Sequence, residues 1–449
     1  MKKKILGLLG VFLAIWVSLP QGVFAASFQI DFDTACAAIQ LVNLDTGTVV
    51  YEKNPDERRE PASTTKIMTY IVVYENVADP DNTKVTIAEK IRDELLGTGS
   101  SLSGIQVGDV LSVTRLLHCM MIPSGNDAAL ALADFVGGGD VQKFVDMMNE
   151  KAEELGCTGT HFANPHGLHD DEHYTTARDL AIITQYAMMI PGFMDVCNTR
   201  SEYYTVEGGP AAGEQRLLVT TNRMIHPNLD PQYYYQYAQG IKTGSHDQAG
   251  YCLVSSAQKN GMSYLCVALG APSVDEAGNR ITEHREYNDT ISLYNWAFDT
   301  LGLRTLADEN DAVTEVPLRF AWNQDTLLLT PAESFTTILP DDISSSSIIA
   351  TPDVPDYVEA PVKKGDVIGT VTYSYADQEL ATVNLVAGES VERSELLKSA
   401  STVKEIVTSP WFLLIAGIVV LLLIVYLVLA LIYNRKKKKL RKVRKYKNM

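Results

Sequence analysis

The chain has 449 residues, which is enough for two or three domains. Hydrophobic residues make up 46% and charged residues 21% of it, a composition that excludes a disordered or collagen-like protein. The formal net charge is −17, but three lysines at the start and ten cations in the last forty residues leave −30 for the stretch between them. Because nucleic-acid binding depends on cations that neutralise phosphates, this acidic body excludes nucleic acid as a partner.

Residues 1–26 have the pattern of a signal peptide. Three lysines precede the apolar run of residues 5–19, and the small residues that follow allow cleavage after Ala25 or Ala26. A first transmembrane helix is the alternative, but the apolar run is short for one. We therefore expect this segment to be removed on export.

The other end of the chain predicts a membrane anchor. Residues 411–433 carry no charge, and as a helix these 23 residues would extend about 35 Å, enough to cross a bilayer. Positively charged flanks stay on the cytoplasmic side, so residues 434–449 are expected to be a basic cytoplasmic tail. The body would then lie outside the cell membrane, joined to a single-pass helix by a stalk at residues 392–410.

The exported part predicts two domains. Between residues 27 and 305, apolar or alternating runs predict strands at 37–43, 48–51, 240–244, 250–257 and 262–270. Helical patterns lie at 61–74, 110–135 (interrupted at 123–125), 141–155, 176–189 and 285–300. Strands that bracket a helical middle indicate an α+β domain. Residues 312–391 contain only short alternating runs, which predict a small all-β domain, and they hold no histidine or cysteine to carry chemistry.

The six cysteines are expected to be mostly buried thiols. Export would permit three disulfides in any of 15 pairings. However, the domain is large enough to be stable without them, and most of the cysteines stand in apolar runs. No Cys-x-x-Cys pair occurs, so a thiol-redox or cysteine–zinc site has no support.

Ser63 and Lys66 form a Ser-x-x-Lys pair at the start of a predicted helix. Residues three apart share a helix face, so the amine can reach the hydroxyl. Serine needs a base before it attacks an acyl carbon, and lysine can be that base only if its pKa is lowered. The motif alone is weak evidence, because Ser256-x-x-Lys259 and Ser401-x-x-Lys404 also occur.

Two further motifs favour Ser63 over the other two serines. Ser124-Gly125-Asn126 is the only Ser-x-Asn in the chain, and it falls in a break between helical runs. Lys242-Thr243-Gly244 is the only Lys-Thr-Gly, and it lies on a predicted strand, as that motif requires. Lys242 and Thr243 suit a substrate carboxylate, and Gly244 leaves room for close backbone approach. A helix cap and a solvated lysine are plausible alternatives singly, but not for all three motifs in order.

With these motifs the sequence resembles the low-molecular-mass penicillin-binding proteins, which are serine-type D-alanyl-D-alanine carboxypeptidases of the penicillin-binding protein 5 type. The resemblance covers about residues 35–300 and extends to a β-rich C-terminal domain around residues 360–369. Further stretches that carry it are residues 61–69, 123–129, 164–168, 173–179 and 249–252. It implies a β-lactamase/transpeptidase-like fold, with an antiparallel sheet and helices, for the first domain.

The resemblance also implies an activity and partners. The protein would remove the terminal D-alanine from peptidoglycan stem pentapeptides through an acyl-enzyme, and β-lactam antibiotics would acylate it. Ser63 would be the nucleophile and Lys66 the general base, with Ser124 and Asn126 completing the proton and substrate network.

The same resemblance assigns the Lys-Thr-Gly strand. Lys242 and Thr243 would hold the terminal carboxylate, and the backbone N–H groups of Ser63 and Ser245 would form the oxyanion hole. Family members usually have an aromatic residue or histidine and then threonine after Lys-Thr-Gly, whereas Ser245-His246-Asp247 stands here. The family's usual anchor is an amphipathic helix on the membrane surface, whereas this chain is predicted to span the membrane.

Competing interpretations are a β-lactamase-like hydrolase, which shares the motifs, and a non-catalytic cell-wall scaffold. The all-β domain and the membrane span argue against the first, and the intact motif set argues against the second. His166, His169, Asp170, Asp171, Glu172 and His173 have the chemistry of metal ligands. Because Pro165-His166-Gly167 indicates a turn, however, we predict neither a metal nor a cofactor.

Overall fold

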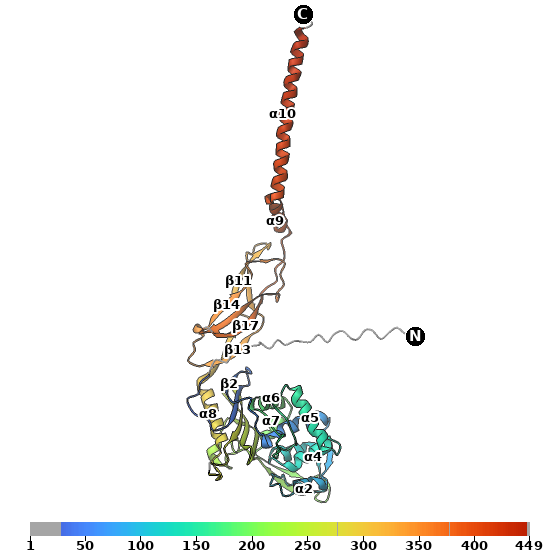
Figure 1. Cartoon of the computed structure of the whole chain (residues 1–449), viewed down its shortest axis with the longest axis vertical. Coiled ribbons are helices and arrows are strands. Elements are labelled where there is room, and N and C mark those ends of the chain that lie inside the picture. Colours follow the sequence, from blue (N-terminus) through green and yellow to red (C-terminus); the bar gives the residue numbers. More distant parts are fainter. Residues whose placement is uncertain (1–27, 276, 377, 447–449) are drawn as a thin grey trace, which may run out of the picture. The chain divides into compact units, whose positions relative to one another are not determined.

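The structure is a computed structural model that describes residues 28–275, 277–376 and 378–446 (Figure 1). It contains two compact units: residues up to 305 together with 336–348, and residues 306–335 together with those from 349 onward. The predicted signal peptide, residues 1–26, lies outside the described residues.

The first unit is built on a five-stranded antiparallel sheet of order β2-β1-β9-β8-β7. Its strands are β1 (Ala38–Asn43), β2 (Val49–Lys53), β7 (Ala238–His246), β8 (Gly250–Lys259) and β9 (Met262–Ala271). The β1–β2 hairpin thus pairs, through β1, with strand β9, which follows it by about two hundred residues. β7, which carries the Lys-Thr-Gly motif, is an edge strand.

Both faces of this sheet are covered. Helix α8 (Arg285–Thr300) packs on one face, where Tyr294 is fully buried among Ile39, Leu41 and Leu253. The helical part of the unit packs on the other face, against alternate strand residues such as Val42 and Val254. Because side chains alternate along a strand, burial on both faces explains why these strands read as nearly continuous apolar runs.

The middle of the chain is helical, as predicted. Its elements are η1 (Ala62–Thr65), α1 (Lys66–Asn76), α2 (Glu89–Leu95), α3 (Val113–Met121), α4 (Asn126–Val136), α5 (Val141–Glu154), α6 (Ala177–Met188), α7 (Phe193–Cys197) and η2 (Pro231–Tyr233). The helix expected from residue 110 begins later, because Ser112 caps α3 by accepting from the Arg115 N–H and residues 110–112 form a strand.

Three further pairs of short strands lie outside the two larger sheets. They are β3 (Lys84–Thr86) with β4 (Val110–Ser112), β5 (Ser201–Thr205) with β6 (Gln215–Val219), and β10 (Leu301–Ala307) with β13 (Phe335–Pro340). The β5–β6 hairpin was not predicted. The α+β class and the β-rich second part are confirmed.

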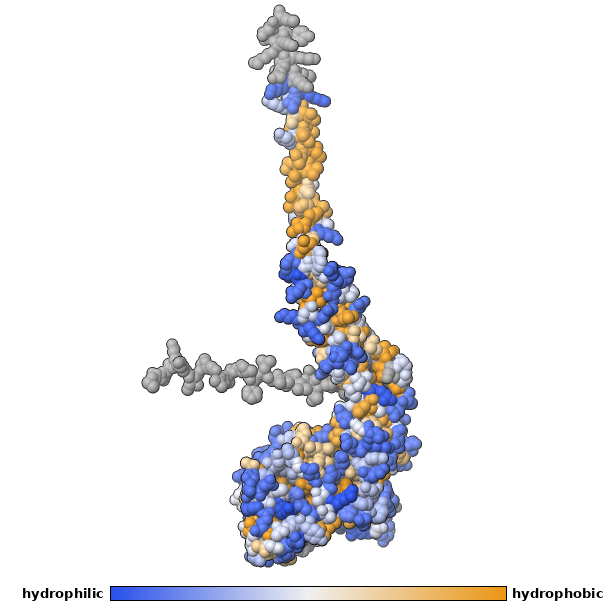
Figure 2. All heavy atoms as spheres, turned by 180° about the vertical axis from the view of Figure 1, so that it is seen from behind, coloured by the Kyte–Doolittle hydropathy of each residue, from blue (hydrophilic) through white to orange (hydrophobic). Residues whose placement is uncertain are grey.

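The second unit contains a six-stranded sheet of order β14-β16-β17-β12-β11-β15. The strands are β11 (Thr314–Arg319), β12 (Thr326–Pro331), β14 (Ile349–Asp353), β15 (Val358–Glu359), β16 (Val367–Tyr375) and β17 (Gln378–Ala387). Helices α9 (Glu395–Thr408) and α10 (Pro410–Tyr446) follow. Residues 410–437 of α10 have a peak mean hydropathy of 3.3, so this helix is long and apolar enough to cross a membrane. Figure 2 shows it as a continuous apolar band.

All six cysteines are buried free thiols, as the sequence indicated. Burial raises the pKa of the thiols, for example that of Cys119 to about 12. They therefore act as small apolar side chains in the core.

Candidate active site

The turn that carries Ser63 is held by its own threonines. Thr64 Oγ1 donates to the Pro61 carbonyl at 2.7 Å, and Thr65 Oγ1 donates to the Ala62 carbonyl at 2.8 Å. Thr65 Oγ1 also lies 2.7 Å from His173 Nε2, in a segment more than a hundred residues away. The two threonines of Ser-Thr-Thr-Lys therefore fix the 3₁₀ turn from which α1 begins.

The Lys66 amine lies beside the Ser63 hydroxyl, at 2.9 Å. The same Nζ is 2.6 Å from Asn126 Oδ1 and 2.8 Å from the His166 carbonyl oxygen. Lys66 is fully buried, so these three contacts replace its hydration. The structure thus brings together three of the predicted residues, Ser63, Lys66 and Asn126, around one nitrogen.

Burial lowers the pKa of Lys66 well below the usual lysine value, and the nearby charge of Lys242 lowers it further. A neutral amine has two N–H groups and one lone pair. Asn126 Oδ1 and the His166 carbonyl can accept only, so the two N–H groups are directed to them. In the neutral form the lone pair would face the Ser63 hydroxyl, as a general base requires, whereas the protonated amine would donate to the Ser63 oxygen.

Ser124 and Asn126 stand at the start of α4. Ser124 is buried, and its φ of +65° places it in the left-handed region, which is uncommon for a residue other than glycine. Asp127, the next residue of α4, accepts from the Ser103 N–H at 2.9 Å, and the Asn126 N–H donates to the Ser101 carbonyl at 2.8 Å. The loop at residues 101–104 is therefore tied to the Ser-x-Asn turn.

Gly244 allows β7 to approach Ser63. A Cβ at this position would lie 2.8 Å from the Pro61 carbonyl oxygen and 3.0 Å from the Ser63 nitrogen. On the other side of the turn, a Cβ on Gly167 would lie 1.9 Å from the Ala62 carbonyl oxygen. The Ser63 turn thus lies between the backbones at Gly244 and Gly167, and only glycine allows backbones to approach this closely.

A cavity of about 190 Å³ opens onto Ser63. Its lining residues are Ser63, Ser101, Ser124, Thr221, Arg223, Thr243, Gly244, Ser245, Tyr251, Cys252, His284, Glu286 and Tyr287. The Thr221 and Thr243 hydroxyl oxygens lie 2.7 Å apart at one wall. Lys242 is not among these lining residues. It is almost fully buried, its Nζ donates to the Thr243 carbonyl at 3.0 Å, and burial lowers its pKa to about 7.

Three parts of this site could not be predicted from the sequence. The acceptor from residue 166 is a backbone carbonyl, which no motif identifies. Thr221 and Arg223 reach the cavity from the segment between β6 and β7, and Arg223 pairs with Asp230 at 2.8 Å. Only the tertiary structure brings this segment to the Lys-Thr-Gly strand.

The residues that follow Lys-Thr-Gly face different parts of the structure. Ser245 lines the cavity, whereas His246 turns to Glu60, whose carboxylate lies 3.3 Å from His246 Nε2 and 2.9 Å from His169 Nδ1. The imidazole that lines the cavity is instead His284, which lies 2.8 Å from the Glu286 carboxylate.

The histidines suggestive of metal ligands have separate partners. Burial lowers the pKa of His166 and of His173 to about 3, so both are neutral, and they serve the Ser63 turn through a carbonyl and a hydrogen bond. Within residues 28–275, 277–376 and 378–446, no group of three or more His, Cys, Asp or Glu side chains is arranged to hold a metal ion.

Comparison with known proteins identifies the family. The family described as D-alanyl-D-alanine carboxypeptidase, peptidase S11, matches residues 25–273, more than half of the chain. The chain belongs to this family. The family described as penicillin-binding protein 5, C-terminal domain, matches residues 302–393, which include the six-stranded sheet.

Several relatives match over most of their length. The D-alanyl-D-alanine carboxypeptidase DacF of Bacillus subtilis is 30% identical over 356 residues, 79% of this chain and 85% of that protein. The structure of penicillin-binding protein 5 from Haemophilus influenzae matches with a TM-score of 0.63 and 25% identity, covering 81% of this chain and all of that one. The Streptomyces K15 DD-transpeptidase has a TM-score of 0.54 at 31% identity, over 60% of this chain. The family resemblance inferred from the motifs is therefore confirmed.

Proposed function

We propose that this D-alanyl-D-alanine carboxypeptidase removes the terminal D-alanine of peptidoglycan stem pentapeptides, with Ser63 as nucleophile and Lys66 as its base. The observation that carries the assignment is the fully buried Lys66 amine, 2.9 Å from the Ser63 hydroxyl. With its N–H groups directed to Asn126 and to the His166 carbonyl, this amine can take the Ser63 proton as the oxygen attacks.

The remaining steps are those that the family resemblance implies for these residues. The Ser63 oxygen attacks the carbonyl carbon of the penultimate D-alanine, and the proton passes to Lys66. The backbone N–H groups of Ser63 and Ser245 would stabilise the oxyanion. Ser124 would pass the proton to the departing amine, and D-alanine leaves. Water then attacks the ester, gives a proton to Lys66, and restores the Ser63 hydroxyl.

The terminal carboxylate would bind at the wall formed by Thr221 and Thr243. Arg223, which is paired with Asp230, also lines this cavity, and the buried Lys242 amine donates to the Thr243 carbonyl. The positive charge of Lys242 next to Thr243 would favour an anion at this wall. Because Lys242 is buried behind the wall, it acts on the carboxylate mainly through its charge, and the hydroxyl of Thr243 makes the contact.

The membrane helix would place this site beside its substrate. With α10 across the cell membrane and the basic tail in the cytoplasm, the catalytic unit lies outside, where wall precursors are inserted. Peptidoglycan stem peptides and β-lactams are the ligands that membership of the family implies for this site.

Penicillin should acylate Ser63 and leave slowly. Efficient hydrolysis of the penicilloyl ester needs a base for water, and class A β-lactamases use a glutamate. Of the described residues, Glu286 is the one carboxylate residue that lines the cavity, and it is held by His284. The hydrogen bonds of Ser63 and Lys66 among these residues include no carboxylate, which favours a carboxypeptidase over a β-lactamase.

The assignment is tested with the purified full chain in detergent and a synthetic pentapeptide, followed by mass spectrometry. The wild-type protein should remove one alanine, and Ser63→Ala should remove none and bind no fluorescent penicillin. Ser401→Ala, in the Ser-x-x-Lys of α9, a helix with no buried residue, is the matched control and should behave as wild type. Covalent labelling of Ser63→Ala at Ser256 or Ser401 would overturn the assignment.

A further inference from the structure

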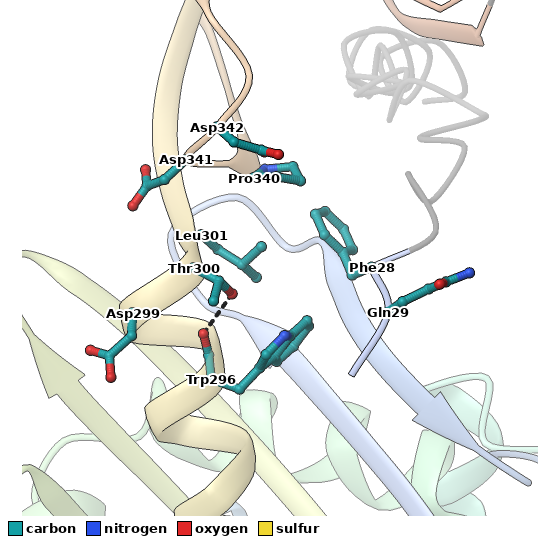
Figure 3. A pocket seen from close by; sticks show the side chains of 9 residues that line it. All are labelled: Phe28, Gln29, Trp296, Asp299, Thr300, Leu301, Pro340, Asp341 and Asp342. Atoms are coloured by element: carbon teal, nitrogen blue, oxygen red, sulfur yellow. Dashed lines mark hydrogen bonds between the residues drawn. The ribbon is translucent and has the colours of Figure 1, made fainter. Parts of the chain in front are cut away.

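A second cavity, of about 430 Å³, lies in the catalytic unit at the far end of α8 (Figure 3). The apolar side chains of Trp296, Phe28, Leu301 and Pro340 surround it. Trp296 and Phe28 are each partly exposed, so part of each aromatic side chain is available to a ligand. An open concave site with two partly exposed aromatic side chains can hold the apolar face of a small ring.

Polar groups stand at the rim. Asp299 and Asp341 are engaged in ion pairs, with Lys259 at 2.9 Å and Arg304 at 3.0 Å. Asp342 and Gln29 are exposed, and among the hydrogen bonds and ion pairs of the described residues neither side chain has a partner. They can therefore accept or donate hydrogen bonds to a ligand without breaking a contact.

The charge of the rim restricts what can bind. Among the described residues, three aspartates and no Lys, Arg or His line the cavity. Lys259 and Arg304 pair with two of these aspartates, so the charge of Asp342 disfavours an anionic ligand such as a phosphate or a nucleotide. A cation would meet only exposed carboxylates, which add little to affinity in water. A neutral ring with an apolar face and several hydroxyl groups could pack against the two aromatic side chains and form hydrogen bonds with the polar groups at the rim.

The position of the cavity relates it to the active site. Glu286 near the start of α8 lines the Ser63 cavity, and Trp296 lines the second cavity ten residues later, so about 15 Å of helix separates them. An extended chain of five residues spans at most about 17 Å. A sugar strand held at Trp296 would thus keep the stem peptides along that strand close to the Ser63 cavity.

We propose that the cavity at Trp296 binds a neutral amino-sugar ring of the glycan strand, and so raises the local concentration of stem peptides at Ser63. The proposal rests on the proposed function, because the glycan strand matters only if Ser63 acts on the stem peptides. It adds a binding site that does not take part in the chemistry, and the gain is one of effective concentration.

The binding test uses tryptophan fluorescence of the full chain in detergent, titrated with the N-acetylglucosamine tetramer. We expect a saturable change that is lost in Trp296→Ala and kept in Trp322→Phe, the matched control at an exposed tryptophan of the second unit. A tetramer of lysine should give no saturable change. No saturable response to the sugar, or saturation by the lysine peptide instead, would overturn the proposal.

The kinetic test compares free pentapeptide with uncrosslinked glycan strands that carry pentapeptides. Trp296→Ala should raise KM for the strands about three- to tenfold, the loss expected for one aromatic contact, without changing kcat. Its unchanged activity on free pentapeptide would show that the fold is intact. If Trp296→Ala does not fold, the double variant Gln29→Ala with Asp342→Ala, both at exposed side chains, should show the same selective rise. An equal KM for strands in variant and wild type would contradict the proposal.

The two proposals fail separately. If the wild-type protein hydrolyses no pentapeptide, the proposed function is wrong, while the fluorescence titration still reports on sugar binding. If pentapeptide is hydrolysed but the sugar does not bind, only the glycan site is wrong.

Discussion

Gly244→Ala tests whether the spacing between β7 and the Ser63 turn controls catalysis. The added Cβ would lie 2.8 Å from the Pro61 carbonyl oxygen and 3.0 Å from the Ser63 nitrogen, where ordinary contacts begin at 3.4 Å. The strand and the turn must therefore separate by about half an ångström. A displacement of about 1 Å at reacting groups can cost about a hundredfold in rate, so we expect a loss of about ten- to a hundredfold.

The fold should survive this substitution. Gly244 lies on an edge strand and its φ is not in the left-handed region, so alanine is permitted there apart from the clash. Overpacking of this kind costs about 1–3 kcal/mol. In a catalytic unit of this size, at about 2–4 °C per kcal/mol, that corresponds to a drop in Tm of about 2–12 °C.

The assay is the second-order rate constant of acylation by a fluorescent penicillin, with D-alanine release from pentapeptide measured in parallel. Gly388→Ala is the matched control, because a Cβ there meets its nearest atom, the Leu328 carbonyl oxygen of the second unit, at 3.2 Å. It should acylate at the wild-type rate. Wild-type acylation by a folded Gly244→Ala protein would refute the reasoning, because the close approach would then have no role.

Three further outcomes are expected. Because burial lowers the pKa of Lys242 to about 7, its charge is present below that pH and lost above it, so kcat/KM for substrates with a free carboxylate should fall as pH rises through about 7. Substrates with an amidated terminus should lack this fall, and identical pH profiles would show that Lys242 does not act on the carboxylate. In burst kinetics, one equivalent of penicillin should bind and leave over minutes, and Glu286→Gln should release it no more slowly. Rapid multiple turnover without D-alanine release from pentapeptide would instead indicate a β-lactamase. Protease added to spheroplasts should digest the catalytic unit and spare the basic tail, and a protected catalytic unit would mean that the orientation is reversed.

The sequence alone determined the local elements that carry the chemistry. Ser63 and Lys66 lie on one helix face because they are three residues apart, and that spacing needs no tertiary information. The break at Pro123-Ser124-Gly125 and the apolar strand before Gly244 are likewise local patterns. The unbroken run at residues 411–433 predicted the helix that is long and apolar enough to cross a membrane, because that property depends only on length and apolarity.

Only the tertiary structure decided how these elements meet. The pKa of Lys66 is lowered by burial and by Lys242, which lies 176 positions further along the chain, and no local pattern reports either effect. The His166 backbone carbonyl reaches Lys66, and Thr221 reaches the cavity from the segment between β6 and β7. Neither contribution has a sequence motif. His284 faces the cavity while His246 turns to Glu60, a difference set by where α8 begins on the sheet. Contacts that depend on distant segments follow from packing, and packing is decided by the whole fold rather than by any window of the sequence.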